Sequence, residues 1–470
     1  MTSLWLDTCL PVPSPAELPT DRVVDTLVVG AGLTGLTTAV LLARAGQDVV
    51  VAEARHVGAV ATGNTTAKLS LLQGTVLSQM RRHHPAEVIR AYVEGNREGQ
   101  AWLLRLLEER GVEYETRVAW TYATTARGRD ALADELRAAQ EAGLPVLATT
   151  ETELPFEARA IRLADQAQIH PTRVLEALLR ELEEHGGRVV EGARLTGLEA
   201  GEPCVATTTI GEVRARHVVL ATGTPVLDRG LYFAKLEAHR SYATAFEASL
   251  PVPLGMYLST DDPARSLRTA DTGSGPMLLV GGNDHVVGRT RSERAQVDDL
   301  VTWAHDHFPG LRLSRSWSAQ DYRPAGRVPF VGPMPRTDGR VQVATGYDKW
   351  GMTNAVSAAL TMSSEILGGE IGEWAQTLRT RVTTPRDLAS GVAANAAVGV
   401  GMVTGWAGEI AARAKGDRRD CGLSRVCTHL GGILEWNDAE ASWDCPLHGS
   451  RFDADGRVLE GPATRDLDGS

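Results

Sequence analysis

Lysine is scarce in this chain of 470 residues. Lysine and arginine together number 48, and lysine stands only at Lys68, Lys235, Lys349 and Lys415. A position that keeps lysine in such an arginine-rich chain is a candidate for a role that needs a compact point charge. The net charge is −11, which argues against nucleic acid or an anionic membrane as the main partner.

Cysteine is also rare, and long apolar runs are missing. The five cysteines are Cys9, Cys204, Cys421, Cys427 and Cys445. They are too scattered for a disulfide framework, so we expect a reducing cytoplasm as the compartment. The three near the C-terminus indicate metal or cluster chemistry. Residues 1–21 lack the basic and apolar parts of a signal peptide. The stretch 389–407 is rich in glycine and alanine, so we expect a small-residue helix or linker there and no membrane span.

A dinucleotide-binding pattern stands near the N-terminus. An apolar strand over 25–30 leads into Gly30-Ala-Gly32-Leu-Thr-Gly35, a helix over 36–45 and a second strand over 49–52 that ends at Glu53. Gly30 permits a tight turn, Gly32 lets the backbone approach a pyrophosphate, and Gly35 lets helix and strand pack closely. The helix N-terminus attracts phosphate, and Glu53 can accept hydrogen bonds from ribose hydroxyls. An empty α/β unit with a glycine turn is the alternative.

Three later motifs distinguish FAD from NAD. They are a small polar stretch over 61–68 (ATGNTTAK), an apolar strand over 217–220 that ends in Ala-Thr-Gly, and the segment 341–353 (VQVATGYDKWGMT) before a helix over 354–367. Together with the glycine turn, they resemble the D-amino-acid oxidase and glycine oxidase family of FAD oxidoreductases over roughly residues 23–368. The resemblance implies an FAD-binding fold with an antiparallel substrate domain.

The resemblance also implies which residues contact FAD. In that family the polar stretch wraps the flavin and its phosphates, the Ala-Thr-Gly turn lies beside the FAD, and backbone near Leu195, ahead of that turn, contacts adenine. The third motif places N–H groups and a helix N-terminus at the flavin pyrimidine edge, where reduced flavin carries negative charge. The residues concerned are Thr62, Gly63, Asn64, Thr65, Thr66, Ala67, Lys68, Leu195, Ala221, Thr222, Gly223, Gly346, Trp350, Gly351, Met352 and Thr353.

Two residues are candidates for the catalytic chemistry. Lys349 is one of two lysines inside the flavin motifs, and our hypothesis is that it stabilises the anionic flavin. An ordinary surface lysine is the alternative. Arg323 matches the family arginine that holds a substrate carboxylate, although an arginine of purely structural role fits the chain equally well. No catalytic base stands out, and oxidation of a neutral amine by hydride transfer does not need one.

The remaining pattern suggests how the first 385 residues divide. Amphipathic helices are predicted over 84–110, 130–142 and 171–184, and alternating strands with turn signals over 232–318 suit an antiparallel sheet. We predict an FAD-dependent oxidoreductase over 1–385, with FAD-binding parts at about 22–75, 155–230 and 325–370. The predicted substrate-domain parts are about 76–154 and 231–324. A linker or helix over 386–410 and a small domain over 411–470 follow.

The C-terminal pattern is Cys427-Thr-His429 and, after 15 residues, Cys445-Pro-Leu-His448. A tetrahedral zinc site could use the same four ligands. The two short glycine-bearing loops resemble the Rieske signature more closely, which implies a [2Fe–2S] cluster. Two cysteine thiolates bind one iron of such a cluster, and two histidines bind the other.

The surroundings of these ligands depart from the respiratory Rieske pattern. Gly432 and Leu447 stand where an additional disulfide would join the loops, and Phe452 replaces a tyrosine donor, while Ser450 keeps a hydroxyl. Fewer donors stabilise the reduced cluster less, so we predict a potential below the respiratory type, within ~−150 to +300 mV. Few residues precede the first loop, so we expect an abbreviated all-β domain that packs against the flavin domain for part of its burial.

The two halves together suggest a redox enzyme. We expect FAD-dependent oxidation of a small amine or amino acid, with electrons passed through the cluster to an unknown acceptor. An NAD(P)H-dependent reductase that feeds a partner protein is the alternative, although the sequence contains only one dinucleotide fingerprint. A flavoprotein with a structural or sensing cluster is a third possibility. The fusion resembles a bacterial subfamily of FAD oxidoreductases with a C-terminal Rieske domain.

Overall fold

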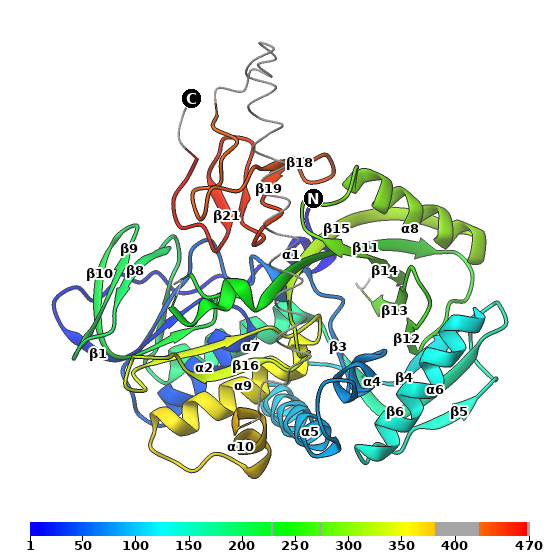
Figure 1. Ribbon diagram of the computed structural model, residues 1–470, viewed down its shortest axis with the longest axis horizontal. Helices are drawn as coiled ribbons and strands as arrows, with labels where there is room; N and C mark the ends of the chain where they lie inside the picture. The colour runs from blue at the N-terminus through cyan, green and yellow to red at the C-terminus, as the bar shows by residue number, and fades with distance from the viewer. Residues whose placement is uncertain (227–228, 272–274, 381–422, 468–470) are drawn as a thin grey trace.

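The chain forms two large β-sheets with helices around them and a third, small sheet near the C-terminus (Figure 1). The structure is a computed structural model that describes residues 1–226, 229–271, 275–380 and 423–467. The predicted linker over 386–410 and the start of the predicted 411–470 domain lie outside the described residues. The Gly- and Ala-rich stretch 389–407 lies outside them as well.

The first sheet has eight strands and a parallel centre. Strand β1 pairs in parallel with β2 and β10, β2 with β7, and β10 with β17. Its central strands are apolar runs buried on both faces, as parallel strands between two layers require. The strands are β1 (Val23–Val29), β2 (Val49–Ala52), β7 (Arg188–Val190), β8 (Leu195–Glu199), β9 (Cys204–Thr208), β10 (Gly211–Leu220), β16 (Phe330–Pro333) and β17 (Val341–Thr345).

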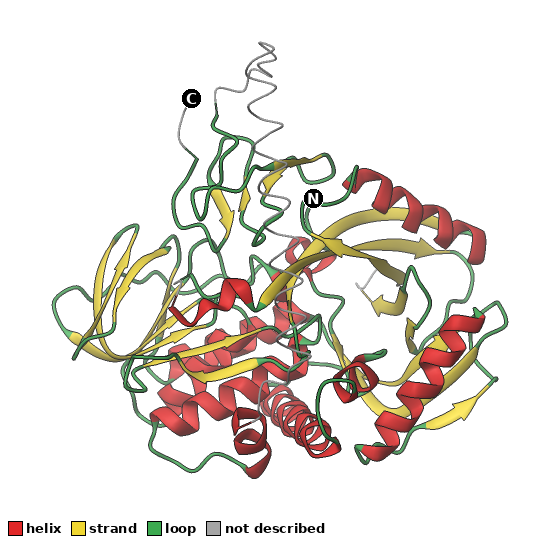
Figure 2. Cartoon of the chain, in the orientation of Figure 1, coloured by secondary structure: helices red, strands yellow, loops and turns green. Residues whose placement is uncertain are grey.

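Helices cover one face of this sheet, with the antiparallel β8–β9–β10 extension on its other side (Figure 2). Helices α2 and α9 pack together, with α5 against α9 and α7 against α2. The predicted helix over 171–184 is confirmed, and the last predicted helix begins three residues earlier, at Gly351. These helices are α2 (Leu33–Arg44), α5 (Ala86–Glu109), α7 (Pro171–Glu184), α9 (Gly351–Ile366) and α10 (Glu373–Thr380).

The second sheet has nine mostly antiparallel strands, which confirms the sheet predicted over 232–318. Strand β6 pairs with β4 and β5 in this sheet, although its residues fall within a predicted FAD-binding part. The strands are β3 (Lys68–Leu69), β4 (Glu115–Ala123), β5 (Leu147–Thr149), β6 (Arg159–Gln168), β11 (Leu236–Ala248), β12 (Met256–Ser259), β13 (Arg265–Asp271), β14 (Pro276–Val286) and β15 (Leu311–Pro324). The helices around it are α4 (Val76–Arg81), α6 (Ala126–Glu141) and α8 (Glu293–His307).

The third sheet contains only very short strands: β18 (Glu435–Asn437), β19 (Ser442–Asp444), β20 (Arg451–Phe452) and β21 (Val458–Glu460). Its core is a small cluster that includes Leu434 and Phe452, both fully buried. The sheet lies beside the ends of β11 and β15 (Figure 1). This confirms a mixed α/β fold followed by a separate, small all-β unit.

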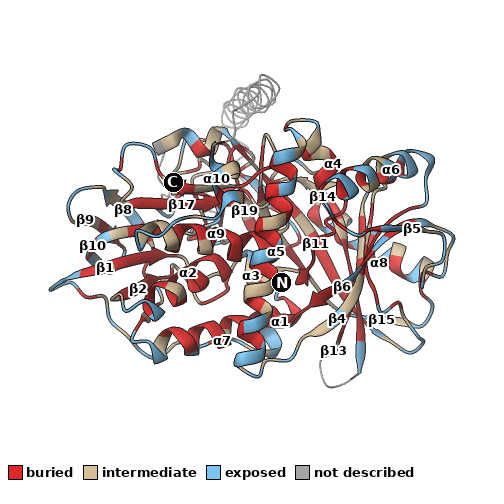
Figure 3. Cartoon of the chain, turned by 90° about the horizontal axis from the view of Figure 1, so that it is seen from below, coloured by how far each residue is buried: buried red, intermediate tan, exposed pale blue. Residues whose placement is uncertain are grey.

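Three short helices complete the described chain: α1 (Leu4–Thr8), α3 (Ala61–Asn64) and the 3₁₀ segment η1 (Arg229–Ala234). Buried residues run through the central strands and the inner faces of the helices, while the tips of β5 and the β8–β9 turn are exposed (Figure 3). No helix in the described ranges is long and apolar enough to cross a membrane.

Candidate functional site

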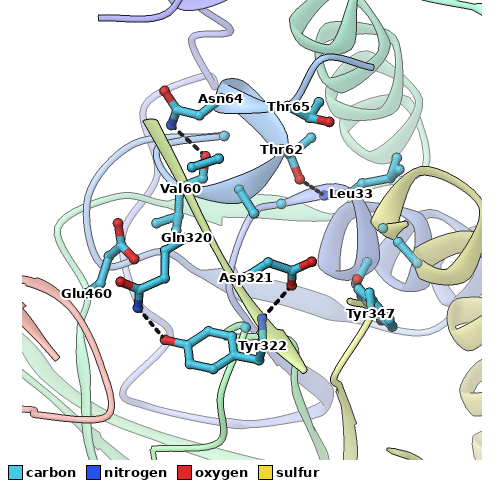
Figure 4. A pocket seen from close by; sticks show the side chains of 18 of the residues that line it. Leu33, Val60, Thr62, Asn64, Thr65, Gln320, Asp321, Tyr322, Tyr347 and Glu460 are labelled. Atoms are coloured by element: carbon cyan, nitrogen blue, oxygen red, sulfur yellow. Dashed lines mark hydrogen bonds between the residues drawn. The ribbon is translucent and has the colours of Figure 1, made fainter. Parts of the chain in front are cut away.

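A cavity of about 340 Å³ lies where all three sheets meet, within the ~300–1,000 Å³ typical of small-molecule sites. Figure 4 shows Thr62 and Thr65 of the polar stretch, Gln320 and Asp321 of β15, and Glu460 of β21 around it. One wall therefore comes from the glycine-turn region, another from the nine-stranded sheet and a third from the C-terminal unit.

The glycine turn shows why these positions cannot carry side chains. Gly30 has φ +105°, and a Cβ there would lie 2.6 Å from the carbonyl oxygen of Ala221. A Cβ on Gly35 would lie 1.8 Å from the carbonyl oxygen of Gly30. Helix α2 starts directly after Gly32, and its Leu33 N–H donates to the Thr62 hydroxyl at 3.1 Å (Figure 4). The cradle is therefore tight, as close approach to a dinucleotide requires.

Glu53 directly follows β2 and lines the cavity. Its carboxylate accepts the N–H groups of Ala31 and Arg55, each at 2.8 Å. Burial raises the pKa of Glu53, and these two hydrogen bonds oppose that rise. A carboxylate has about four acceptor sites, so two are left over, which fits the predicted bonds to ribose hydroxyls.

Most of the predicted FAD residues lie on this cavity, although their individual contacts with FAD stay predictions. Those that line it are Gly30, Gly32, Glu53, Thr62, Asn64, Thr65, Thr66, Lys68, Leu195, Ala221, Thr222, Gly223, Gly346, Trp350, Gly351 and Met352. Four others do not line it: Gly35 and Gly63 pack against backbone, Ala67 is fully buried, and the Thr353 hydroxyl donates to Asn96.

Lys68 reaches from the polar stretch into the nine-stranded sheet. Its Nζ donates to the carbonyl of Tyr257 and to the hydroxyl of Ser266, both at 2.6 Å. Burial holds the pKa of Lys68 well below its usual value, and the nearby Arg268 guanidinium lowers it further. The structure thus places this lysine on the cavity, with its Nζ held by two acceptors.

The four predicted cluster ligands lie on two neighbouring loops. The thiols of Cys427 and Cys445 share a hydrogen bond, which lowers the pKa of Cys427 to about 6 and raises that of Cys445 well above its usual value. The rings of His429 and His448 are 5.2 Å apart between centroids. No three such side chains in the described part of the chain are placed around a single ion.

The residues around the cluster loops match the sequence predictions about them. A Cβ on Gly432 would lie 2.7 Å from Leu447 Cδ1, so these two positions are adjacent and leucine fills the place of a disulfide. The Ser450 hydroxyl hydrogen-bonds to Cys427 and accepts the N–H of Ala463 at 3.0 Å. Phe452 is fully buried. One hydroxyl donor therefore remains beside the cysteines.

Residues 25–364 match the FAD dependent oxidoreductase family, and residues 400–469 match the Rieske [2Fe-2S] domain. The chain belongs to the FAD dependent oxidoreductase family. A similar protein is the putative Rieske 2Fe-2S iron-sulfur protein YhfW of Bacillus subtilis, 30% identical over 97% of this chain and 95% of that protein. The cytochrome b6-f iron-sulfur subunit 1 of Nostoc is 52% identical over 48 residues, 10% of this chain and 27% of that subunit.

Solved structures of low sequence identity share the fold of this oxidoreductase. Glycine oxidase from Geobacillus kaustophilus has a TM-score of 0.65 and 19% identity, over 77% of this chain and 100% of that one. L-proline dehydrogenase from P. horikoshii has a TM-score of 0.61 and 15% identity, over 74% and 95%. The protein is thus an FAD-dependent oxidoreductase with a C-terminal Rieske domain that binds a [2Fe–2S] cluster.

The two candidate catalytic residues of the oxidoreductase belong to one partly buried ion cluster. Lys349 lines the cavity and pairs with Asp284 at 2.8 Å. Arg323 does not line the cavity; it pairs with Asp284 and Asp348, each at 2.9 Å, and contacts His239 at 3.1 Å. Burial alone would raise the pKa of Asp284, but His239, Lys349 and Arg323 hold it below its usual range. Substrate binding by Arg323 stays a prediction, and these carboxylates compete for its guanidinium.

Asp321 is a cavity residue that the sequence did not single out. It lies on β15 and accepts the N–H groups of Tyr322, at 2.7 Å, and Lys349 (Figure 4). Burial raises its pKa to about 6. It directly precedes Tyr322, which also lines the cavity, and Arg323, which does not, so the motif contained it, but only the tertiary structure shows which of these residues reach the cavity.

The Rieske domain contributes directly to the FAD cavity. Its Leu459, Glu460 and Gly461 line the cavity. On the flavin side, Gln320 of β15 lines the same cavity and donates to the carbonyl of Gly449 at 2.7 Å. Gly449 directly follows the predicted cluster ligand His448, so a single side chain spans from the cavity wall to that loop.

Proposed function

We propose that this protein oxidises a small amine or amino acid at FAD and passes the electrons one at a time through the Rieske cluster to an external acceptor. The substrate would lose a hydride and a proton to become an imine, which water hydrolyses. FAD supplies the two-electron acceptor. The two electrons would leave singly to two equivalents of a one-electron acceptor, and two protons would be released to solvent, one lost directly by the substrate and one from the transferred hydride.

The hydrogen bond from Gln320 to Gly449 carries this proposal. Gln320 is 2% exposed, and its amide also donates to the Tyr322 hydroxyl at 3.0 Å, which in turn donates to the Gly461 carbonyl at 3.3 Å. The bonds join the cavity wall to both loops of the cluster domain that approach it. Such a short, covered path suits electron transfer between two cofactors of one chain.

The substrate class rests on chemistry and on fold relatives. The solved structures with this fold include a glycine oxidase, an L-proline dehydrogenase and an L-amino acid deaminase from Proteus myxofaciens. A cluster is superfluous where oxygen reoxidises the flavin directly, so its presence favours a dehydrogenase. Asp284, Asp321 and Lys349 would set the charge at the cavity.

Anaerobic reduction tests the proposal. The purified holoprotein is mixed with a panel of amines and amino acids while flavin absorbance and the EPR signal of the reduced cluster are followed. We expect one compound class to bleach the flavin and then to produce the cluster signal. A Gln320→Leu variant should bleach at the native rate and reduce its cluster more slowly. Bleaching without any cluster signal in the native protein would refute the electron path.

The NAD(P)H-dependent reductase remains the second candidate, on the ground that a Rieske cluster also suits a protein that feeds a partner. It predicts that NADH or NADPH bleaches the flavin in the absence of any amine. No bleaching by either nucleotide, together with bleaching by an amine, would eliminate it.

A further inference from the structure

The N-terminal helix α1 lies against the polar stretch that lines the FAD cavity. It precedes residue 25, where the match to the oxidoreductase family begins. Ser3, Leu4 and Trp5 are nevertheless almost completely buried. The Ser3 hydroxyl donates to the carbonyl of Gly63, and Trp5 Nε1 donates to the carbonyl of Thr65 at 2.6 Å.

Five consecutive carbonyls of the polar stretch, from Gly63 to Ala67, accept hydrogen bonds from side chains. Ser3 and Trp5 take the first and third. Trp317 Nε1 of β15 donates to the second, that of Asn64, at 2.9 Å. Arg268 Nη1 of β13 donates to the fourth and fifth, at 2.8 and 2.9 Å. Side chains from three separate parts of the chain therefore hold one short loop.

Trp5 also interacts with Arg268, whose guanidinium holds the last two carbonyls. The guanidinium of Arg268 lies 5.2 Å from the centroid of the Trp5 ring, where the negative face of the ring attracts a cation. Arg268 is 2% exposed, and no carboxylate pairs with it among the described residues. Burial lowers its pKa to about 9. The indole thus compensates part of the cost of burying that charge.

The pinned carbonyls determine where the N–H groups of the loop point. In a trans peptide the N–H points opposite to the carbonyl of the preceding residue. With the carbonyls of Asn64 and Thr65 held by Trp317 and Trp5, the N–H groups of Thr65 and Thr66 are directed away from those donors. Both residues line the cavity, and within the described chain neither N–H has a hydrogen-bond acceptor.

We propose that α1 is a working part of the FAD site, in which Ser3 and Trp5 are positioning residues. They hold the polar stretch so that the N–H groups of Thr65 and Thr66 remain available as donors to FAD. Donors fixed before binding lose less entropy when the ligand arrives. Removing the α1 bonds therefore weakens FAD binding through the loop, without any contact between α1 and FAD.

The test uses Trp5→Phe, which keeps an aromatic ring beneath Arg268 and removes the N–H donor, and the double variant Ser3→Ala/Trp5→Phe. FAD is titrated into the apoprotein, and binding is followed by flavin fluorescence. Trp5→Phe should raise the dissociation constant of FAD roughly five- to tenfold, the equivalent of one lost hydrogen bond. The double variant should raise it further. Trp436→Phe, at an exposed indole of β18, is the matched control and should bind FAD like the native protein.

Thermal unfolding separates positioning from general stability. The midpoint of each apoprotein and the increase produced by saturating FAD are both measured, since a ligand stabilises only the state that binds it. We expect similar apoprotein midpoints and a smaller FAD-induced increase in the variants. Unchanged FAD affinity in the double variant overturns the proposal. A loss of apoprotein stability with an unchanged FAD-induced increase overturns it as well, because α1 would then only support the fold.

Discussion

Arg240 of β11 and Asp444 of β19 form an ion pair between the flavin and cluster domains, with Nη2 and Oδ2 3.2 Å apart and each side chain 1% exposed. Arg240 also donates to the hydroxyl of Ser318 at 2.7 Å and to Gln320 at 3.0 Å. Asp444 directly precedes the predicted cluster ligand Cys445. Burial alone would raise the pKa of Asp444, but Arg240 and Arg451 hold it below its usual value. The pair thus anchors a cluster loop to the sheet that forms the cavity.

Arg240→Met should separate the two domains. Removing one partner of a buried pair costs about 3–5 kcal/mol where no other partner remains, and less here because Asp444 keeps Arg451 at 3.3 Å. We expect the flavin to bleach normally with an active substrate and the cluster to be reduced much more slowly, as measured by anaerobic stopped-flow and freeze-quench EPR. Arg312→Met, which removes the exposed pair with Glu247, is the control. Equal cluster reduction in both variants would contradict a role of the pair in docking.

Cys445→Ser should remove the cluster and leave the flavin. Cys445 is a predicted ligand inside the small core of the Rieske domain, so iron content and the EPR signal should be lost while FAD absorbance persists. Turnover with the natural acceptor should fall to background, because the electrons lose their route from the flavin. Cys204→Ser, at a buried cysteine of β9, should keep both cofactors. Full turnover in Cys445→Ser would instead support a structural or sensing cluster.

Lys349→Met tests the hypothesis that this lysine stabilises the reduced flavin. Its side chain is 37% exposed, so we expect flavin reduction to slow by roughly tenfold, less than the ~100-fold or more of a fully enclosed donor. The flavin midpoint potential should also become more negative. Lys235→Met removes a lysine that lies over the Tyr232 and Phe330 rings and serves as the control. An unchanged spectrum, potential and rate in Lys349→Met would dismiss the hypothesis.

Glu135 of α6 should make the protein less stable as the pH rises. It is fully buried and accepts the N–H groups of Leu77, at 3.2 Å, and Ser78, at 2.8 Å. Burial raises its pKa to about 7 from a usual value of 4.5. A raised carboxyl pKa means that the folded state binds more protons, so stability is lost as the pH rises from about 4.5 to 7, by up to about 3 kcal/mol.

Thermal midpoints measured at several pH values check this. The native midpoint should fall between about pH 5 and 8, and the fall should be smaller in Glu135→Gln, which carries no titrating group. Glu141→Gln, at an exposed carboxylate of the same helix that pairs with Arg81, should retain the native slope. Parallel pH profiles for the native protein and Glu135→Gln would show that Glu135 keeps an ordinary pKa.

The local patterns of the sequence determined the fold class and both cofactor motifs. The glycine turn with Glu53, the two cysteine and histidine loops and the helix over 171–184 each depend on residues close in the chain. Backbone geometry, helix periodicity and ligand spacing act over such short distances. For this reason the α/β fold and the small all-β domain could be predicted before any tertiary contact was known.

Only the tertiary structure decided which side chains meet. Arg323 carries a family role in the sequence, but folding brings it against Asp284 and Asp348. Ser3 and Trp5 lie in the N-terminal segment 1–21, to which the sequence patterns assigned no role, yet they hold a loop some 60 residues away. Gln320 and Gly449 are joined across 129 residues. Contacts of this kind depend on strand register and on the docking of separate units. The local patterns of one sequence do not specify either of these.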